Sequence, residues 1–204
     1  MQRFFKRLVR MLFLLAAVPL WLGYRGQAVC FGENRAIAGW SQLLGLVPGS
    51  CGEYLRFAFY HCVFPKVGPD ACISFGVLFS NAKTSLGRAV YIGPYCVLGE
   101  VDIGDDVLLG SQVSVMNGAK QHGIERLDVP IREQPGLWPS VTIGQDSWIG
   151  DRAIVMANVG RHCVVGAGTV VTQPVPDYAI VVGNPARIIK YRNEVNVEQL
   201  RNSN

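Results

Sequence analysis

Histidine is the residue type that most readily moves a proton near neutral pH, and this chain has three of them. His122 lies within a polar insertion at 116–140, MNGAKQHGIERLDVPIREQPGLWPS, which separates two regularly patterned segments. Long loops on a rigid scaffold usually carry function, and an imidazole suits general-base catalysis. His122 is therefore the candidate base, and Glu133 or Asp128 could orient its ring, unless both carboxylates are simply solvated.

The other two histidines lie in patterns that indicate structural roles. His61 belongs to the amphipathic stretch FAFYHCVF, and His162 in VGRHCV is expected to point outward near a corner of a repeat. A histidine zinc site needs clustered ligands, and the wide spacing of the three histidines does not supply them. Nor do the six cysteines form a CxxC pair. We therefore expect no metal.

A repeat of six residues supplies the scaffold for this chemistry. Ten of the fifteen aliphatic or aromatic residues in the repeat are followed directly by Gly, where the glycine content predicts about two by chance. The fifteen positions are Val67, Ile73, Phe79, Leu86, Ile92, Leu98, Ile103, Leu109, Val115, Ile143, Ile149, Val155, Val159, Val165 and Val171. This period is typical of a parallel β-solenoid with three flat sides, in which the large residue points inward.

The six-residue spacing predicts about five coils, and it slips at three places. The steps from Phe79 to Leu86, from Leu98 to Ile103 and from Val155 to Val159 are seven, five and four residues. A bulged or shortened corner is expected at each slip. The first coil is the least regular, because Lys83 occupies a position where a small residue is expected.

The N-terminal region, residues 1–65, has helical rather than six-residue periodicity and is expected to form a helical appendage. Arg3, Arg7 and Arg10 would share one helix face, and an apolar run at 11–22 follows, interrupted by Pro19. That run is shorter than the about 20 residues that span a bilayer. The segment 1–25 is interpreted as an interfacial or re-entrant membrane anchor; a cleaved signal peptide and helices packed on protein are the alternatives.

Composition and charge narrow the setting of the protein. Half of the 204 residues are hydrophobic, which is enough for a sizeable core, and the net charge is only +4. The basic cluster adjoins an apolar run without interleaved aromatic and basic residues, so a membrane surface is favoured and no nucleic-acid partner is expected. The cysteine spacing shows no disulfide framework, so reduced thiols and a cytoplasmic location are expected.

Three stretches closely resemble the hexapeptide-repeat acyltransferase superfamily, which includes maltose, galactoside and serine O-acetyltransferases. They are the repeat, the insertion with His122, and DSWIGDRAIVMANVGRHCVVGAGTVVTQPVPDYAIVVGNPARIIKYR at 146–192. The chain looks most like acetyltransferases of bacterial surface-polysaccharide biosynthesis. The resemblance implies a left-handed parallel β-helix over 66–183, a C-terminal tail at 184–204, and a homotrimer with active sites between neighbouring subunits.

The resemblance also assigns residues to the chemistry. His122 matches the catalytic histidine of the family, and acetyl-CoA is the implied cosubstrate. The positions that match the acyl-CoA site of the family are Trp148, Asp151, Ala167, Thr172, Arg187 and Lys190. Trp148 would line the pantetheine tunnel, unless it packs under the loop; Arg187 and Lys190 would meet the CoA phosphates, unless they are solvated cations.

One departure from the family concerns the acceptor. Galactoside and maltose acetyltransferases carry an acceptor-binding asparagine before the loop, whereas YIGPYCVLG has none here; Asn117 and Asn81 are alternatives. We therefore expect an O-acetyltransferase acting on a lipid-linked or nucleotide-linked sugar or a polysaccharide precursor, at the inner face of a bacterial membrane. A small soluble acceptor such as serine or an amino sugar, and a non-catalytic β-helix scaffold, are the alternatives.

Overall fold

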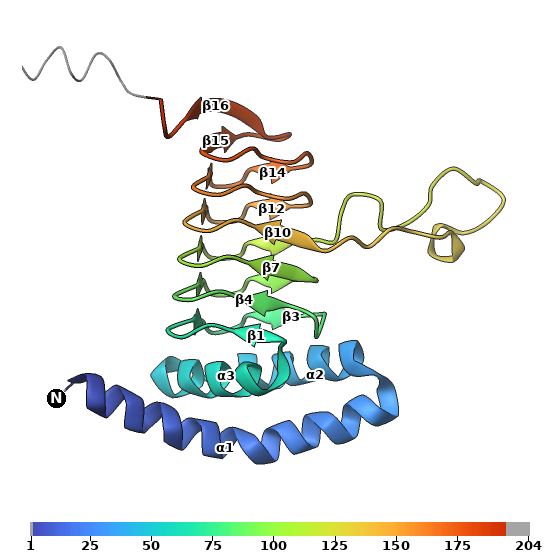
Figure 1. Cartoon of the computed structure of the whole chain (residues 1–204). Helices are drawn as coiled ribbons and strands as arrows, with labels where there is room; N and C mark the ends of the chain where they lie inside the picture. Colours follow the sequence, from blue (N-terminus) through green and yellow to red (C-terminus); the bar gives the residue numbers. More distant parts are fainter. Residues whose placement is uncertain (1, 195–204) are drawn as a thin grey trace, which may run out of the picture.

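The computed structural model describes the backbone of residues 2–194 and the side chains of residues 9–194. Three helices form the helix layer at one end of the molecule, with α2 and α3 between α1 and the strands (Figure 1): α1 (Gln2–Phe31), α2 (Glu33–Gly45) and α3 (Gly49–Val63). Gly32 separates α1 from α2, and Gly49 begins α3; their positive φ angles of 85° and 66° lie in a backbone region that suits glycine. The predicted helix face with Arg3 and Arg7 and the tail beyond 194 lie outside the described side chains.

The first helix is longer than the apolar run suggested, because α1 continues through Pro19. The stretch Val9–Phe31 has the length and the composition of a membrane-spanning helix, although a core helix or a signal sequence can have both as well. A proline inside a helix removes one backbone hydrogen bond and bends the helix. Pro19 is exposed, so water can reach the carbonyl group that loses its donor.

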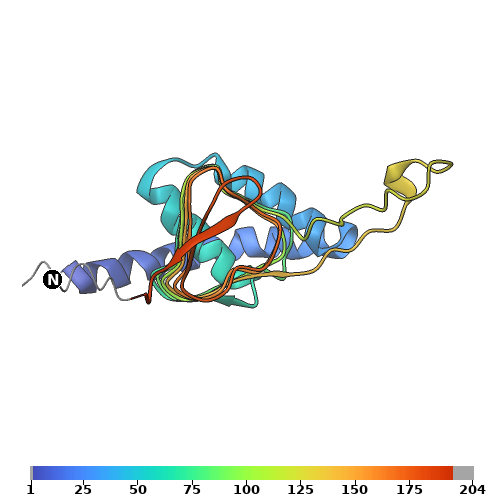
Figure 2. The same cartoon turned by 90° about the horizontal axis from the view of Figure 1, so that it is seen from above.

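Above the helices the chain winds into a triangular prism of short strands, seen end-on in Figure 2. The strands are β1 (Lys66–Val67), β2 (Cys72–Ile73), β3 (Leu78–Phe79), β4 (Ser85–Leu86), β5 (Tyr91–Ile92), β6 (Val97–Leu98), β7 (Val101–Ile103), β8 (Leu108–Leu109), β9 (Ser114–Val115), β10 (Val141–Ile143), β11 (Trp148–Ile149), β12 (Ile154–Val155), β13 (Val164–Val165), β14 (Val170–Val171), β15 (Ala179–Val182) and β16 (Arg187–Tyr191).

The strands stack into three parallel sheets, one for each side of the prism. The first side is β1-β4-β7-β10, the second is β2-β5-β8-β11-β13-β15, and the third is β3-β6-β9-β12-β14. Parallel bridges at Val159 and Val175 continue the first side by two further levels. The prism therefore has about six turns; the prediction of about five was wrong because the sixth turn, Val175 with β15, lies beyond the last residue counted in the repeat.

The large residue of each hexad points into the prism, as the repeat predicts. Ile73, Leu86, Ile92, Leu109 and Ile149 are all completely buried. Burial of such side chains contributes roughly 1.5–3 kcal/mol each relative to the exposed state. The residue just before each of these points outward, which gives every strand of the prism its alternating pattern.

The three slips of the repeat all occur at the same edge of the prism, between the third and the first side. These corners comprise residues 80–84, 99–100 and 156–158, and the insertion at 116–140 leaves from the same edge. The longer first corner explains why Lys83 breaks the pattern of the repeat. Lys83 is exposed, and the small residue that points inward at this corner is Thr84. The hydroxyl group of Thr84 donates to the carbonyl oxygens of Asn81 and Gly99.

Both open ends of the prism are covered. Strand β16 pairs antiparallel with β15 and crosses the upper end (Figure 2). At the lower end the rings of Tyr60 and Phe64 lie 4.7 and 5.0 Å from that of Phe79. Without these covers the inward side chains of the first and last turns would face water.

Arg56 joins the helix layer to the first turn. Its side chain is completely buried; Nε donates to the carbonyl oxygen of Ile73, and Nη1 donates to those of Leu44 and Val47. A Cβ on Gly52 would lie 2.0 Å from the carbonyl oxygen of Val47, so the glycine allows this close approach. Burial lowers the pKa of Arg56 from its ordinary value. Arg56 therefore satisfies carbonyl groups that would otherwise be buried without donors.

We predict that Arg56→Met lowers the free energy of unfolding by about 2–4 kcal/mol, because three carbonyl groups lose their donor while the buried volume changes little. Urea unfolding followed by circular dichroism measures the change. Arg88→Met is the matched control: Arg88 is exposed and pairs with Asp106, so a loss of less than about 1 kcal/mol is expected. Equal midpoints for the two variants would contradict the role of Arg56.

Candidate active site

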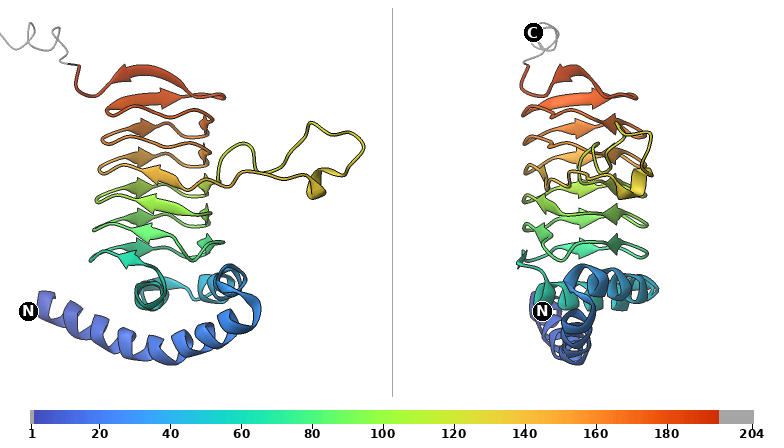
Figure 3. Two further views of the ribbon diagram at one scale, coloured as in Figure 1. Left: turned by 45° about the vertical axis from the view of Figure 1, so that its right-hand side comes forward. Right: turned by 90° about the vertical axis from the view of Figure 1, so that its right-hand side faces the viewer.

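The insertion that carries His122 leaves the prism between β9 and β10 and projects far from it (Figure 3). Asn117 joins the two ends of the insertion at its base. Its Oδ1 accepts from the Glu100 N–H at 3.0 Å, and its Nδ2 donates to the carbonyl oxygens of Glu100 and Pro139 at 2.9 and 3.0 Å. Asn117 is thus occupied by backbone partners, and Asn81 likewise donates to Glu100 Oε2.

Within the insertion, the chain folds back on itself and holds its shape through backbone contacts. The Leu137 N–H donates to the carbonyl oxygen of Lys120 at 2.7 Å, and the buried Gln134 side chain bonds to the backbone of Arg126 and Val129. A Cβ on Gly136 would lie 1.8 Å from the carbonyl oxygen of Gln121, so the two arms touch at a glycine. The insertion is therefore a folded arm rather than an open loop.

His122 is exposed on this arm, and its ring meets that of Trp138 edge-on at 5.6 Å. Neither predicted orienting carboxylate contacts it within the chain. Glu133 lies 3.5 Å from Arg132, and Asp128 accepts from Arg126, which lowers the pKa of Asp128. The side chain of His122 is therefore exposed on the arm and does not face the prism of its own chain.

The predicted acyl-CoA residues Trp148, Asp151 and Ala167 lie close to one another, at the edge between the second and third sides. Trp148 is the outward residue of β11 and is 54% exposed. Ala167 lies directly above the corner of Trp148's turn, since a Cβ on Gly150 would be 2.6 Å from the Ala167 nitrogen. Asp151 accepts from the Ser111 N–H at 2.6 Å, so its carboxylate also joins two turns.

The remaining predicted acyl-CoA residues lie elsewhere on the prism. Thr172 follows β14 at the opposite edge of the third side, whereas Arg187 and Lys190 lie on β16 at the upper end. Arg187 is exposed and lines a cavity of about 280 Å³ with Gln173, Val181 and Ile188. Its Nη1 donates to the carbonyl oxygen of Ala186. Within one chain, then, the structure does not bring the six residues or His122 together.

His162 lies in a separate cluster of polar and aromatic side chains, at the edge between the first and second sides. Its Nδ1 lies 2.9 Å from Asp146 Oδ2, and its ring stacks on Tyr178 at 5.1 Å. Arg192 donates to Asp146 and to the carbonyl oxygen of His162, which fastens the chain after β16 to this edge. The hydrogen bond from His162 is the main cause that lowers the pKa of Asp146.

An outward row of apolar side chains was not predicted. Tyr91, Leu108 and Trp148 stack along the second side and are 39%, 49% and 54% exposed. The sequence could have indicated this row, because each of the three residues immediately precedes an inward residue of the repeat. Among the side chains of residues 9–194, no group of three or more His, Cys, Asp or Glu could hold a metal ion.

Comparison with known proteins finds acetyltransferases among the relatives of this chain. Residues 140–173 match the family model described as the hexapeptide repeat of succinyl-transferase. Galactoside O-acetyltransferase of Escherichia coli K12 is 30% identical over 65% of this chain and 66% of its own length. A protein of the same organism named for O-acetyl transfer in lipopolysaccharide biosynthesis is 30% identical over 58% of this chain and 62% of its own.

A solved structure agrees with this kinship. The hexapeptide-repeat acetyltransferase of Vibrio cholerae is 26% identical over 79% of this chain and 94% of its own, with a TM-score of 0.66. The same protein was also solved with acetyl-CoA, and that structure matches with a TM-score of 0.58 at 25% identity. The left-handed parallel β-helix with an N-terminal helical part is thereby confirmed.

The alignments leave part of each curated relative uncovered: the chain spans 66% and 62% of the two Escherichia coli proteins and 38% of a mycobacterial one. The resemblance nevertheless extends through the repeat, the fold and the C-terminal coils. On these grounds the chain belongs to the hexapeptide-repeat acyltransferase family.

Proposed function

We propose that the protein transfers an acetyl group from acetyl-CoA to a hydroxyl group of a sugar or polysaccharide precursor, with His122 as the base. One observation carries the proposal. The arm with His122 leaves the prism just below the fourth turn, and Trp148 and Asp151 lie in that same turn, with Ala167 one turn above. In a side-by-side assembly of parallel prisms, the arm of one chain stands at the level of the acyl-CoA edge of its neighbour.

The transfer needs few groups. The imidazole of His122 takes the hydroxyl proton as the acceptor oxygen attacks the thioester carbon. A carbon–oxygen bond forms, the tetrahedral intermediate collapses, and the carbon–sulfur bond breaks. The imidazolium then returns the proton to the departing thiolate, so CoA leaves as a thiol. The exposed guanidinium of Arg187 suits a CoA phosphate, which it can bind through two parallel hydrogen bonds.

A homotrimer supplies the missing half of the site. The arm exposes several large apolar side chains that its own prism does not cover: Ile124, Leu127, Ile131, Leu137 and Trp138. Leu127 is 98% exposed, and an apolar cluster of this kind usually marks an interface. In a closed threefold ring each arm contacts the next subunit, which covers these side chains and brings His122 to Trp148.

Two relatives support a sugar acceptor, because they act, by name, on galactosides or in lipopolysaccharide biosynthesis. The membrane surface is the second partner, bound through residues 1–25, at the inner face of a bacterial membrane. The outward side chains of the first side include the polar residues Ser85, Asp102, Thr142 and Asn158, whereas no charged residue occurs from 11 to 24 in the helical end. Acetyl is the proposed acyl group.

We predict that His122→Ala lowers turnover by about 10²–10⁴-fold with an unchanged fold, because the attacking hydroxyl loses its base. Thiol release from acetyl-CoA is measured against a panel of free and lipid-linked sugars. His162→Ala is the matched control and should keep turnover, since His162 lies at another edge of the prism. Unchanged turnover in His122→Ala would reject the base; CoA binding without turnover in the wild type would favour the scaffold alternative.

A mixing experiment tests whether sites are shared between subunits. Ala167→Trp should be inactive, because an indole at this exposed corner would block the pantetheine path, and His122→Ala lacks the base. Subunits of the two variants, dissociated and reassembled together at equal amounts, should recover about a quarter of the wild-type activity if each site takes His122 and Ala167 from different chains. Recovery of no activity would place both residues of a site in one chain.

A further inference from the structure

The outer face of α1 is apolar between Met11 and Leu22 and again at Val29. Met11, Leu15, Val18, Leu22 and Val29 follow one another at three-, four- or seven-residue spacing and are 63%, 69%, 44%, 58% and 83% exposed. We call these five residues the apolar stripe. Helical spacing places them on one face, and no charged residue occurs from 11 to 24. No element of the described chain covers this face.

The opposite face of α1 is fixed to the rest of the molecule. Ala17 and Tyr24 are buried, the ring of Phe13 stacks on Tyr54 at 5.5 Å, and the ring of Tyr24 meets Phe59 edge-on at 6.0 Å. These contacts hold the middle part of the helix, from Phe13 to Tyr24. A helix that spanned a bilayer would have to leave α2 and α3 and expose their buried faces to water.

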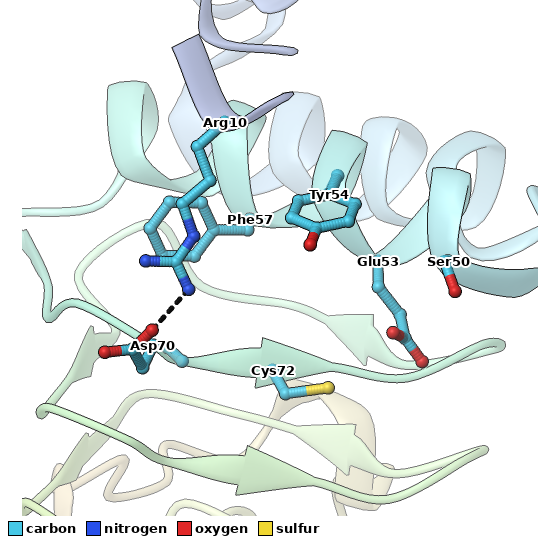
Figure 4. A pocket seen from close by; sticks show the side chains of 8 residues that line it. Arg10, Ser50, Glu53, Tyr54, Phe57, Asp70 and Cys72 are labelled. Atoms are coloured by element: carbon cyan, nitrogen blue, oxygen red, sulfur yellow. Dashed lines mark hydrogen bonds and ion pairs between the residues drawn. The ribbon is translucent and has the colours of Figure 1, made fainter. Parts of the chain in front are cut away.

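Arg10 fastens the N-terminal end of α1 to the prism itself (Figure 4). Its guanidinium pairs with Asp70 at 2.5 Å and lies 5.3 Å above the ring of Phe57. The pair borders a cavity of about 380 Å³ between α1, α3 and the first turn. The charge of Arg10 is thus directed toward the protein, away from the apolar stripe.

We infer that α1 lies flat in the surface of an anionic membrane, with the apolar stripe among the lipids and the prism standing upright on it. Apart from Arg10, which pairs with Asp70, residues 1–32 contain four cations and no Asp or Glu, and this charge complements anionic headgroups. Arg25, which is exposed, lies three residues from Leu22 and four from Val29, at the rim of the stripe. An amphipathic helix of this kind binds in the interface, its apolar face about 5–10 Å deep.

A second copy of the chain fits this face less well than a lipid surface does. Figure 3 shows that α1 is bowed, with its middle farthest from the prism, so the stripe is on the convex side. Two convex faces touch over a short length only, and the N-terminal segment of each copy carries a net positive charge. A fluid lipid surface adapts to the curve and carries the opposite charge.

This orientation sets the height of the active site. Figure 1 shows α2 and α3 between α1 and the prism, and the arm leaves just below the fourth turn. With about 4.8 Å between turns and 8–10 Å between packed helix layers, His122 and Trp148 stand roughly 35 Å from the apolar stripe. Insertion of the helix leaves them on the order of 30 Å above the lipid.

The height restricts the acceptor, a consequence that rests on the proposed function. A hydroxyl group on the sugar next to the lipid cannot reach a site at this distance while the enzyme is docked. Among membrane-bound acceptors, the enzyme should therefore modify a sugar several units away from the lipid, in a growing glycan chain. The acceptor class is a lipid-linked oligosaccharide or polysaccharide, modified at its distal part.

Flotation with vesicles tests the docking. The full-length protein should float with vesicles of phosphatidylethanolamine and phosphatidylglycerol, and Leu15→Glu with Leu22→Glu should weaken binding at least about tenfold. Ile188→Glu with Ile189→Glu is the control, because it adds the same charge to exposed residues at the far end of the prism and should bind as the wild type. Failure of the wild type to float, or equal binding by the stripe variant, would overturn the docking.

Tryptophan quenching by brominated lipids tests the orientation. In variants with a single tryptophan, Trp21 should be quenched by bromine placed near the headgroups more than by bromine placed deep, and Trp148 should not be quenched. Trp21 lies near the middle of Val9–Phe31, so a spanning helix would reverse the order of shallow and deep quenching. That reversal, or quenching of Trp148, would reject the flat orientation.

The acceptor restriction is tested on the same vesicles. A lipid carrying one sugar should be acetylated at least about tenfold more slowly than a lipid carrying a long glycan, while both glycans, once released from lipid, should be accepted in solution. Equal rates on the two lipids would reject the height restriction. No turnover on the released glycans would instead reject the proposed function, and flotation would still decide the docking.

Discussion

The whole prism depends on the close stacking of one backbone corner on the next. Turns are spaced at the distance of hydrogen-bonded strands, so at each corner the backbone of one turn lies against that of its neighbour. A Cβ on Gly104 would be 2.6 Å from the Gln145 nitrogen, and one on Gly150 would be equally close to that of Ala167. Glycine therefore recurs where a side chain would push two turns apart, and this requirement produces the repeat.

The same stacking aligns every position of the hexad with its equivalents above and below. Inward residues form an uninterrupted core, and outward residues form rows, such as Tyr91, Leu108 and Trp148 on the second side. Strands could be added to either end of the stack without limit, so other elements must cover the inward side chains of the first and last turns. Arg56 with the aromatic rings of Tyr60 and Phe64 closes the lower end, and β16 closes the upper one.

The repeat allowed the prism to be predicted because its cause is local to each corner. The sixth turn was missed because Pro176 follows Val175, where Gly follows most inward residues, although Val181 keeps the six-residue step. Pro19 interrupts the apolar run at 11–22, but its exposed position lets α1 continue through it as a bent helix. The distance between His122 and Trp148 could not be predicted from the repeat, because the arm directs His122 away from the prism that carries Trp148 (Figure 3).

The number of turns also connects the two ends of the molecule. The helix layer fixes the base of the prism through Arg56 and Arg10, and the prism is rigid because each turn is bonded to both neighbours. The turns below the arm therefore act as a spacer between the apolar stripe and His122. One turn more or less would move the site by about 4.8 Å along the axis without changing its residues. In the proposed membrane orientation, the number of turns below the insertion would set which part of a membrane-bound acceptor is modified, independently of the chemistry.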